Sequence, residues 1–100
     1  MSVQVEIENK LRIGLEPEFL RVENESHQHN VPPASETHFK VVVVSPRFEG
    51  VRAVRRHQMV YQILAEELAG SVHALALHTF SPDEWQHEKK IHASPECLGG

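Results

Sequence analysis

The chain has 100 residues, of which 40% are hydrophobic and 24% are charged, so it can bury one core but is too short for two. A multidomain enzyme is therefore excluded. Fourteen acidic and ten basic residues give a formal net charge of -4 with neutral histidines, which excludes a polybasic protein that coats nucleic acid.

Cysteine content and hydropathy indicate the cellular compartment that we expect for the protein. The single cysteine, Cys97, cannot form an intramolecular disulfide. The longest apolar run, Val41 to Val44, is far shorter than the roughly 20 residues that span a bilayer, and no charged-then-apolar leader opens the chain. We expect a cytoplasmic protein with no membrane contact.

An amphipathic helix is the first predicted element. Apolar residues recur at every fourth position and therefore share one helical face: Val3, Ile7, Leu11 and Leu15. Gly14 and Pro17 supply the signals that end this helix.

Two strands separated by a loop are predicted next. Residues 19–23 place Leu20 and Val22 on one face, as a half-buried strand does. Residues 27–36 lose this periodicity and contain adjacent prolines, which predicts a loop of about ten residues. Residues 38–44 include four consecutive valines and are predicted to form a second strand that pairs with the first.

A second helix and a third strand follow in the predicted order. Apolar residues return to helical spacing from about Val54 to Leu68, and Gly70 ends this helix. Residues 72–80 alternate as a strand, which places His73 at the start of the third strand.

The last helix is predicted to begin at a capping-box sequence with proline in the first helical position, Ser81-Pro82-Asp83-Glu84. Phe80 is placed where it could pack against Trp85 as a hydrophobic staple. Helical periodicity ends at Ile91.

These elements predict an α+β single domain with the order helix, strand, strand, helix, strand, helix. The three strands form a mixed sheet, and the helices must cover at least one of its faces. The domain is expected to span residues 1–91, and residues 92–100 are expected to be a mobile C-terminal tail.

Charge is concentrated in the middle of this acidic chain. Residues 38–60 carry five basic residues and one acidic residue, which indicates a local surface for anions. The candidates for contact with phosphate are Arg47, Arg52, Arg55 and Arg56, together with His57 at the start of the second helix. The alternative is that these side chains are merely solvated.

The glycine positions limit the kind of nucleic acid that the chain is expected to bind. Domains of the type II KH class clamp single strands with a Gly-x-x-Gly sequence, and this spacing does not occur in the chain. Duplex DNA, contacted by the basic turn and the second helix, is therefore the nucleic-acid option.

Several motifs in order resemble the BolA family. The most specific are Phe48-Glu49-Gly50, Arg56-His57 before an apolar helix, and His73-Ala74-Leu75 after Leu-Ala-Glu-Glu-Leu, within a resemblance that runs from about Leu20 to Trp85. The resemblance implies a fold similar to the type II KH arrangement. It also implies a cytoplasmic partner of monothiol glutaredoxins in iron–sulfur and iron homeostasis and, in some bacterial members, a stress-responsive DNA-binding regulator of transcription.

The resemblance further implies iron ligands. His73 matches the family's histidine at the start of the third strand, which ligates a 2Fe–2S cluster shared with the glutaredoxin, and imidazole is a known ligand of iron in mixed clusters. The second ligand comes from the loop between the first two strands, which has no cysteine here. His29 matches best, with His27 and His38 as alternatives; without the resemblance, loop histidines would be interpreted as solvated surface residues.

Enzymatic function is not indicated. The Ser, His and Asp residues form no recognisable catalytic pattern, and no spacing supports a self-contained zinc site. We predict a non-enzymatic adaptor that shares a 2Fe–2S cluster with a monothiol glutaredoxin through His73 and His29, and that holds no cluster alone. The alternative, compatible with the first, is a DNA-binding transcriptional regulator.

Overall fold

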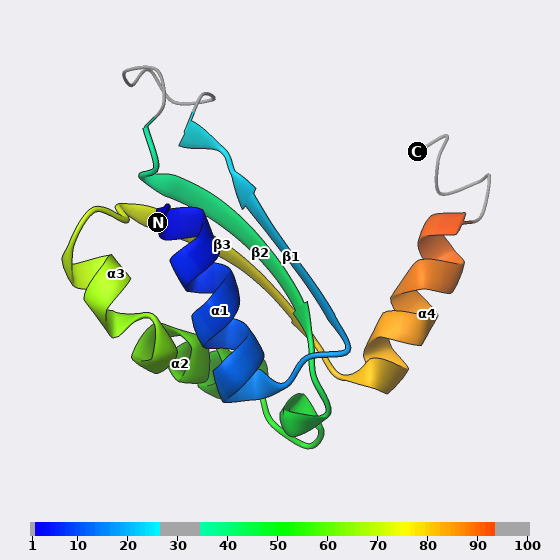
Figure 1. Ribbon diagram of the computed structural model, residues 1–100. Helices are drawn as coiled ribbons and strands as arrows, with labels where there is room; N and C mark the ends of the chain where they lie inside the picture. The colour runs from blue at the N-terminus through cyan, green and yellow to red at the C-terminus, as the bar shows by residue number, and fades with distance from the viewer. Residues whose placement is uncertain (1, 27–34, 94–100) are drawn as a thin grey trace.

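The computed structural model describes residues 2–26 and 35–93. The predicted loop histidines His27 and His29 lie outside these residues, as do residues 94–100 of the predicted tail 92–100, including Cys97. The elements in chain order are α1 (Val3–Leu15), β1 (Phe19–Asn24), β2 (His38–Val44), the short 3-10 helix η2 (Pro46–Phe48), α2 (Ala53–Ile63), α3 (Ala65–Ala69), β3 (Ala74–Phe80) and α4 (Pro82–Ala93) (Figure 1).

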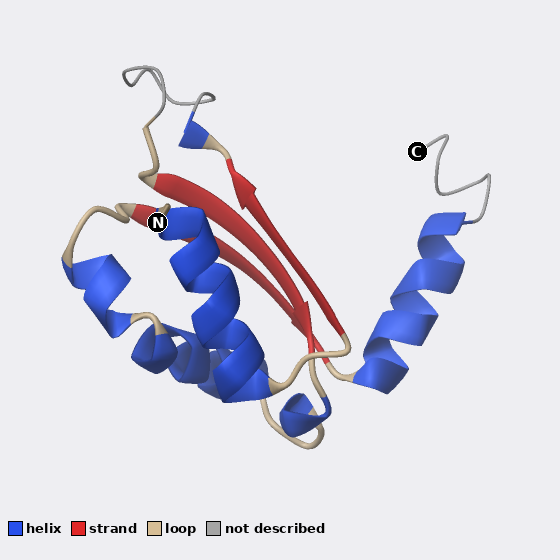
Figure 2. Cartoon of the chain, viewed as in Figure 1, coloured by secondary structure: helices blue, strands red, loops and turns tan. Residues whose placement is uncertain are grey.

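A three-stranded mixed sheet forms the centre of the fold. Strand β2 is the middle strand; it pairs antiparallel with β1 and parallel with β3. Helices α1, α2 and α3 lie on one side of the sheet, and α4 leaves the end of β3 and stands apart from them (Figure 2). The predicted α+β class and sheet are confirmed.

The core lies between the sheet and the helices on its covered face. Side chains of a strand alternate between faces, so every second residue of β1 and β2 points to this core. The apolar stripe of α1 packs against them, as its four-residue spacing predicts. The buried residues of this cluster include Ile7, Leu11, Leu15, Val22, Phe39, Val41, Val43, Phe48, Val60 and Leu64.

The second predicted helix is in fact two helices. Helix α2 ends at Ile63 and α3 begins at Ala65, because Leu64 leaves the helical conformation with φ -101° and ψ 22°. Leu64 is buried in the core, and no glycine or proline marks the break in the sequence. The uninterrupted apolar spacing therefore predicted one helix, whereas tertiary packing turns the chain.

The sequence predicted that Gly14 helps to end α1, but the helix continues past it to Leu15. It lies inside the helix, where an added Cβ would come within 2.7 Å of Ile63 Cδ1 on α2. The chain instead leaves the helix at Glu16, which adopts a left-handed conformation with φ 45° and donates its backbone N–H to Arg12 O at 3.1 Å. Gly14 thus serves close packing of two helices.

The last strand and helix follow the prediction with shifted ends. Strand β3 begins at Ala74, so Val72 and His73 precede it, and α4 continues to Ala93, past the predicted end at Ile91. The capping box is confirmed, because Ser81 N–H donates to Glu84 Oε1 at 2.8 Å and Glu84 N–H donates to Ser81 Oγ at 3.3 Å. Within the described part of the chain, no helix has the length and apolar character needed to cross a membrane.

Candidate functional site

Two histidines meet where β2 and β3 begin. The rings of His38 and His73 lie edge to face, with centroids 6.3 Å apart. His73 is exposed, and its backbone N–H donates to Thr37 O at 2.8 Å, as does that of Ala74 at 3.2 Å. Parallel pairing of β2 with β3 thus brings together two imidazoles that are 35 positions apart in the sequence.

The backbone beside these histidines is held by a buried hydroxyl. Ser26 is 2% exposed, and its Oγ accepts hydrogen bonds from the backbone N–H groups of Thr37 at 2.9 Å and His38 at 3.1 Å. Asn24 adds a second link, because its Nδ2 donates to Ser35 O at 2.9 Å. Segment 27–34 therefore joins two described ends, Ser26 and Ser35, that are tied together next to His38.

Glu36 connects this end of the sheet to α1. Its two carboxylate oxygens accept hydrogen bonds from the backbone N–H groups of Val3 and Gln4, each at 3.2 Å. These N–H groups have no partner within the helix, and a negative charge there also interacts favourably with the helix dipole. The chain that follows segment 27–34 is thus fastened to the first turn of α1.

The histidine pair can supply part of a metal-ligand set. Neutral imidazole ligates iron and other transition metals, and Thr37 Oγ1 lies 2.8 Å from His38 Nδ1, a contact that orients the ring. Across residues 2–26 and 35–93, no three His, Cys, Asp or Glu side chains are grouped to hold a metal ion. A cluster bound here therefore needs ligands from outside the described residues.

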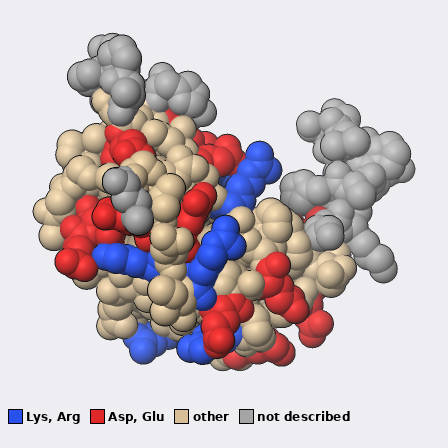
Figure 3. All heavy atoms as spheres, in the orientation of Figure 1, with Lys and Arg blue, Asp and Glu red and all other residues tan. Residues whose placement is uncertain are grey.

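Three of the predicted phosphate-binding arginines are exposed. Arg52 and Arg55 lie at the N-terminus of α2, and Arg47 lies in η2, where it forms an ion pair with Glu16. His57 is half-buried in the first turns of α2. On the face shown in Figure 3, basic and acidic side chains are intermixed, so no continuous basic surface is visible there.

Arg56 has a different position from its neighbours. It is only 7% exposed; its Nε donates to Val51 O at 2.7 Å, and its Nη1 donates to Thr79 O at 3.2 Å. Two further bonds join its guanidinium to the carboxylate of Glu84 on α4, at 2.6 and 3.2 Å. The prediction that Arg56 contacts phosphate does not fit this burial, because its donors are used inside the fold.

The Arg56 and Glu84 pair also sets the charge state at the start of α4. The hydrogen bond from Arg56, followed by that from the Ser81 backbone, lowers the pKa of Glu84 from 4.5 to about 2. Trp85, the next residue, packs on Phe19 and Phe80 with ring centroids 5.1 and 5.2 Å away. One ion pair and one aromatic cluster therefore attach α4 to the domain.

Sequence reasoning missed the residues that hold the histidines. Ser26 and Glu36 show no motif, and their roles depend on partners that are distant in the sequence. The paired arrangement of His38 and His73 could have been found from the predicted sheet, because parallel strands begin at the same edge.

Comparison of the sequence with known proteins matches the chain to one family. The family model described as "BolA-like protein" matches residues 11–84. The chain is 53% identical over 100 residues to "DNA-binding transcriptional regulator BolA" of Escherichia coli (strain K12), covering 99% of this chain and 95% of that protein. It is 51% identical over 98 residues to human "BolA-like protein 1", covering 98% of this chain and 72% of that protein.

Solved structures agree with the fold. The solution structure of BolA1 from Mus musculus has a TM-score of 0.82 and 48% identity, covering 98% of this chain and 80% of that chain. BolA1 from Arabidopsis thaliana has a TM-score of 0.79 and 40% identity, covering 84% of this chain and 96% of that chain.

Proposed function

The chain belongs to the BolA family, and from that premise we propose that it is a non-enzymatic adaptor which binds a monothiol glutaredoxin and supplies histidine ligands to a shared 2Fe–2S cluster. The observation that supports this proposal is the placement of His73 beside His38, at the end of the sheet where segment 27–34 is anchored. A partner must complete the ligand set, because two iron atoms with bridging sulfides need four protein ligands.

His73 is the first proposed ligand. Its ring is exposed, so a cluster held by another protein can reach it. Its backbone is fixed by the hydrogen bond to Thr37 O, which limits the movement needed for ligation.

His29 is the second proposed ligand, and His38 is the alternative among the described residues. Segment 27–34 carries His29 between the anchored residues Ser26 and Ser35. His38 already contacts His73 and Thr37. Separate substitution of His29 and His38 distinguishes them, because loss of a ligand is expected to change the absorbance and lifetime of the cluster more than loss of a neighbouring ring.

Co-purification with a monothiol glutaredoxin tests the adaptor proposal. Co-expression is expected to yield a coloured heterodimer with 2Fe–2S absorbance, whereas anaerobic reconstitution of the isolated chain is expected to give no stoichiometric cluster. A colourless mixture of separate proteins would contradict the proposal, as would a well-defined cluster on the isolated chain.

Duplex DNA binding is the second candidate function. Relatives are named "DNA-binding transcriptional regulator BolA", and in this chain Arg47, Arg52 and Arg55 are exposed around the start of α2. A helix N-terminus flanked by arginines is favourable for phosphate oxygens. His57, half-buried nearby, is a further candidate for an anion contact.

The double variant Arg52→Gln and Arg55→Gln is expected to weaken duplex binding for all sequences. Each phosphate contact contributes about -0.9 to the slope of log K against log salt, so losing two contacts flattens the slope by roughly 1.8. A salt titration by fluorescence anisotropy measures this. Arg12→Gln, an exposed change on α1, is the control, and an unchanged slope in the double variant would remove α2 from the DNA site.

A further inference from the structure

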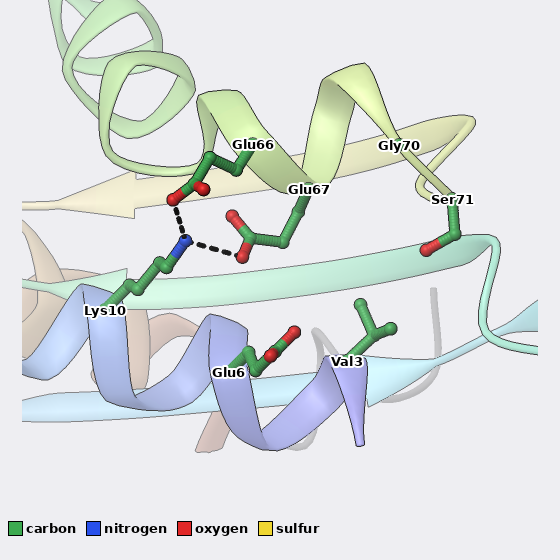
Figure 4. Close-up of a pocket in the computed structure, with 7 residues that line it drawn as sticks. All are labelled: Val3, Glu6, Lys10, Glu66, Glu67, Gly70 and Ser71. Carbon is green, nitrogen blue, oxygen red and sulfur yellow. Dashed lines mark hydrogen bonds and ion pairs between the residues drawn. The ribbon is translucent and has the colours of Figure 1, made fainter. Parts of the chain in front are cut away.

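A cleft of about 360 Å³ lies between α1 and α3. Figure 4 shows that its side chains come from two directions and face one another. Helix α1 contributes Val3, Glu6 and Lys10, whereas α3 and the turn after it contribute Glu66, Glu67 and Ser71.

Glu67 is an unusual residue in this cleft. Its side chain is 7% exposed, and its Oε2 lies 2.7 Å from Lys10 Nζ. Its other oxygen, Oε1, is buried and has no hydrogen-bond donor among the described residues. A buried carboxylate oxygen without a donor carries a free-energy penalty that a ligand with an N–H group can remove.

The cleft has an excess of negative charge. Three carboxylates, those of Glu6, Glu66 and Glu67, line the cleft together with one ammonium, that of Lys10. Lys10 Nζ already bonds Glu66 at 3.0 Å as well as Glu67, and these hydrogen bonds, that of Glu67 first, raise the pKa of Lys10. Among the described residues, no basic side chain forms an ion pair with Glu6. The lining is therefore complementary to a second cation.

From this geometry we propose that the cleft between α1 and α3 binds the ammonium or guanidinium group of a lysine or arginine side chain presented by a partner protein. The charged group lies between Glu6 and Glu67, and the alkyl stem of the side chain contacts Val3. A bare metal ion fits less well, because the described residues contain no group of three metal-ligating side chains. This proposal does not depend on the histidine ligands.

Glu67 can bind Lys10 and the incoming group together. Rotation about the last torsion of a glutamate side chain meets only a low barrier, because this sp³–sp² bond has broad preferences. A partial rotation turns the buried Oε1 toward the cleft, while the partly exposed side chain of Lys10 can follow Oε2 and keep its hydrogen bond. A charge-assisted hydrogen bond to a carboxylate is about twice as strong as a neutral one.

A titration followed by NMR tests the proposal. The full ¹⁵N-labelled chain is titrated with N-acetyl-lysine methylamide or N-acetyl-arginine methylamide, and N-acetyl-citrulline methylamide serves as the uncharged isostere. We expect saturable shifts of the Gly70 and Ser71 amide signals at concentrations on the order of millimolar with the two cations only, since one charged group is bound. No saturable shift with either cation would overturn the proposal, and so would equal binding of citrulline.

Substitutions locate the binding site. Glu67→Gln is expected to weaken binding about tenfold, since it removes a partly desolvated charged acceptor, and Glu6→Gln about threefold. Glu8→Gln is the matched control, because it makes the same charge change on α1 outside the cleft. Equal weakening by Glu6→Gln and Glu8→Gln would contradict a defined site. Glu6→Gln keeps the test valid if Glu67→Gln destabilises the fold.

Discussion

Arg56→Ala is expected to lower the free energy of unfolding by about 2–4 kcal/mol. The substitution leaves the carbonyls of Val51 and Thr79 without the donors that now reach them. It also removes both hydrogen bonds to Glu84, and with them an ion pair that attaches α4. Urea unfolding followed by circular dichroism measures the change.

A control variant and the acid dependence of stability test the expected effect of Arg56→Ala. Arg55→Ala, an exposed change on the same helix, is expected to alter stability by no more than about 0.5 kcal/mol. Because Glu84 has a folded pKa of about 2 against a usual 4.5, its contribution to stability is complete above pH 4.5 and is lost as pH falls toward 2. The Arg56→Ala variant should lose the larger share of this acid dependence, which comes from Arg56, and keep the share that comes from the Ser81 backbone N–H. Equal stability of the two variants would show that the ion pair is dispensable.

His73→Ala is expected to destabilise the cluster in the complex with a monothiol glutaredoxin while leaving the fold intact. The ring is exposed and fills no part of the core. Substitutions of residues that only support metal ligands already cost 10- to 100-fold in affinity, so losing a proposed ligand should shorten the lifetime of the cluster by at least about tenfold. Absorbance and visible circular dichroism of the heterodimer during chelator challenge measure this lifetime.

His78→Ala is the matched control for His73→Ala. His78 is also exposed and lies within β3, the strand that directly follows His73, so the control removes a nearby exposed imidazole. A cluster lifetime unchanged in both variants would remove His73 from the ligand set. Equal shortening in both would indicate a general effect of the surface rather than ligation.

Elements with a clear hydrophobic period could be predicted from the sequence. The four-residue spacing of α1 and the valine run of β2 each require burial on a known face, and the structure buries Ile7, Leu11 and Val41. The start of α4 was predictable for a local reason, since Ser81 and Glu84 are three residues apart and cap each other.

Features that depend on distant contacts could not be predicted. The space at Gly14 is required by Ile63, which lies on another helix, and the break at Leu64 follows from packing rather than from any local breaker. Arg56 was identified within a motif. Whether its guanidinium faces solvent or pairs with Glu84 depends on where α4 packs, and Glu84 is 28 positions away in the sequence.

The histidines of the candidate site could be predicted, but the hydrogen bonds that hold their backbone could not. His73 was identified through the family resemblance, and parallel pairing explains why His38 lies beside it. The hydroxyl of Ser26 and the amide of Asn24 depend on hydrogen bonds across 11 or 12 positions, and serines at such positions usually give no signal.

The carboxylate of Glu36 couples two parts of the protein thermodynamically. Its hydrogen bonds to Val3 and Gln4 exist only when the first turn of α1 is formed and the chain after segment 27–34 is in place. Any ligand or partner that holds residues 35–37 in this position must therefore also reduce fraying of α1. By reciprocity, a more stable first turn of α1 lowers the conformational entropy that residues 35–37 lose when a ligand or partner binds them, and so increases the affinity for that ligand or partner.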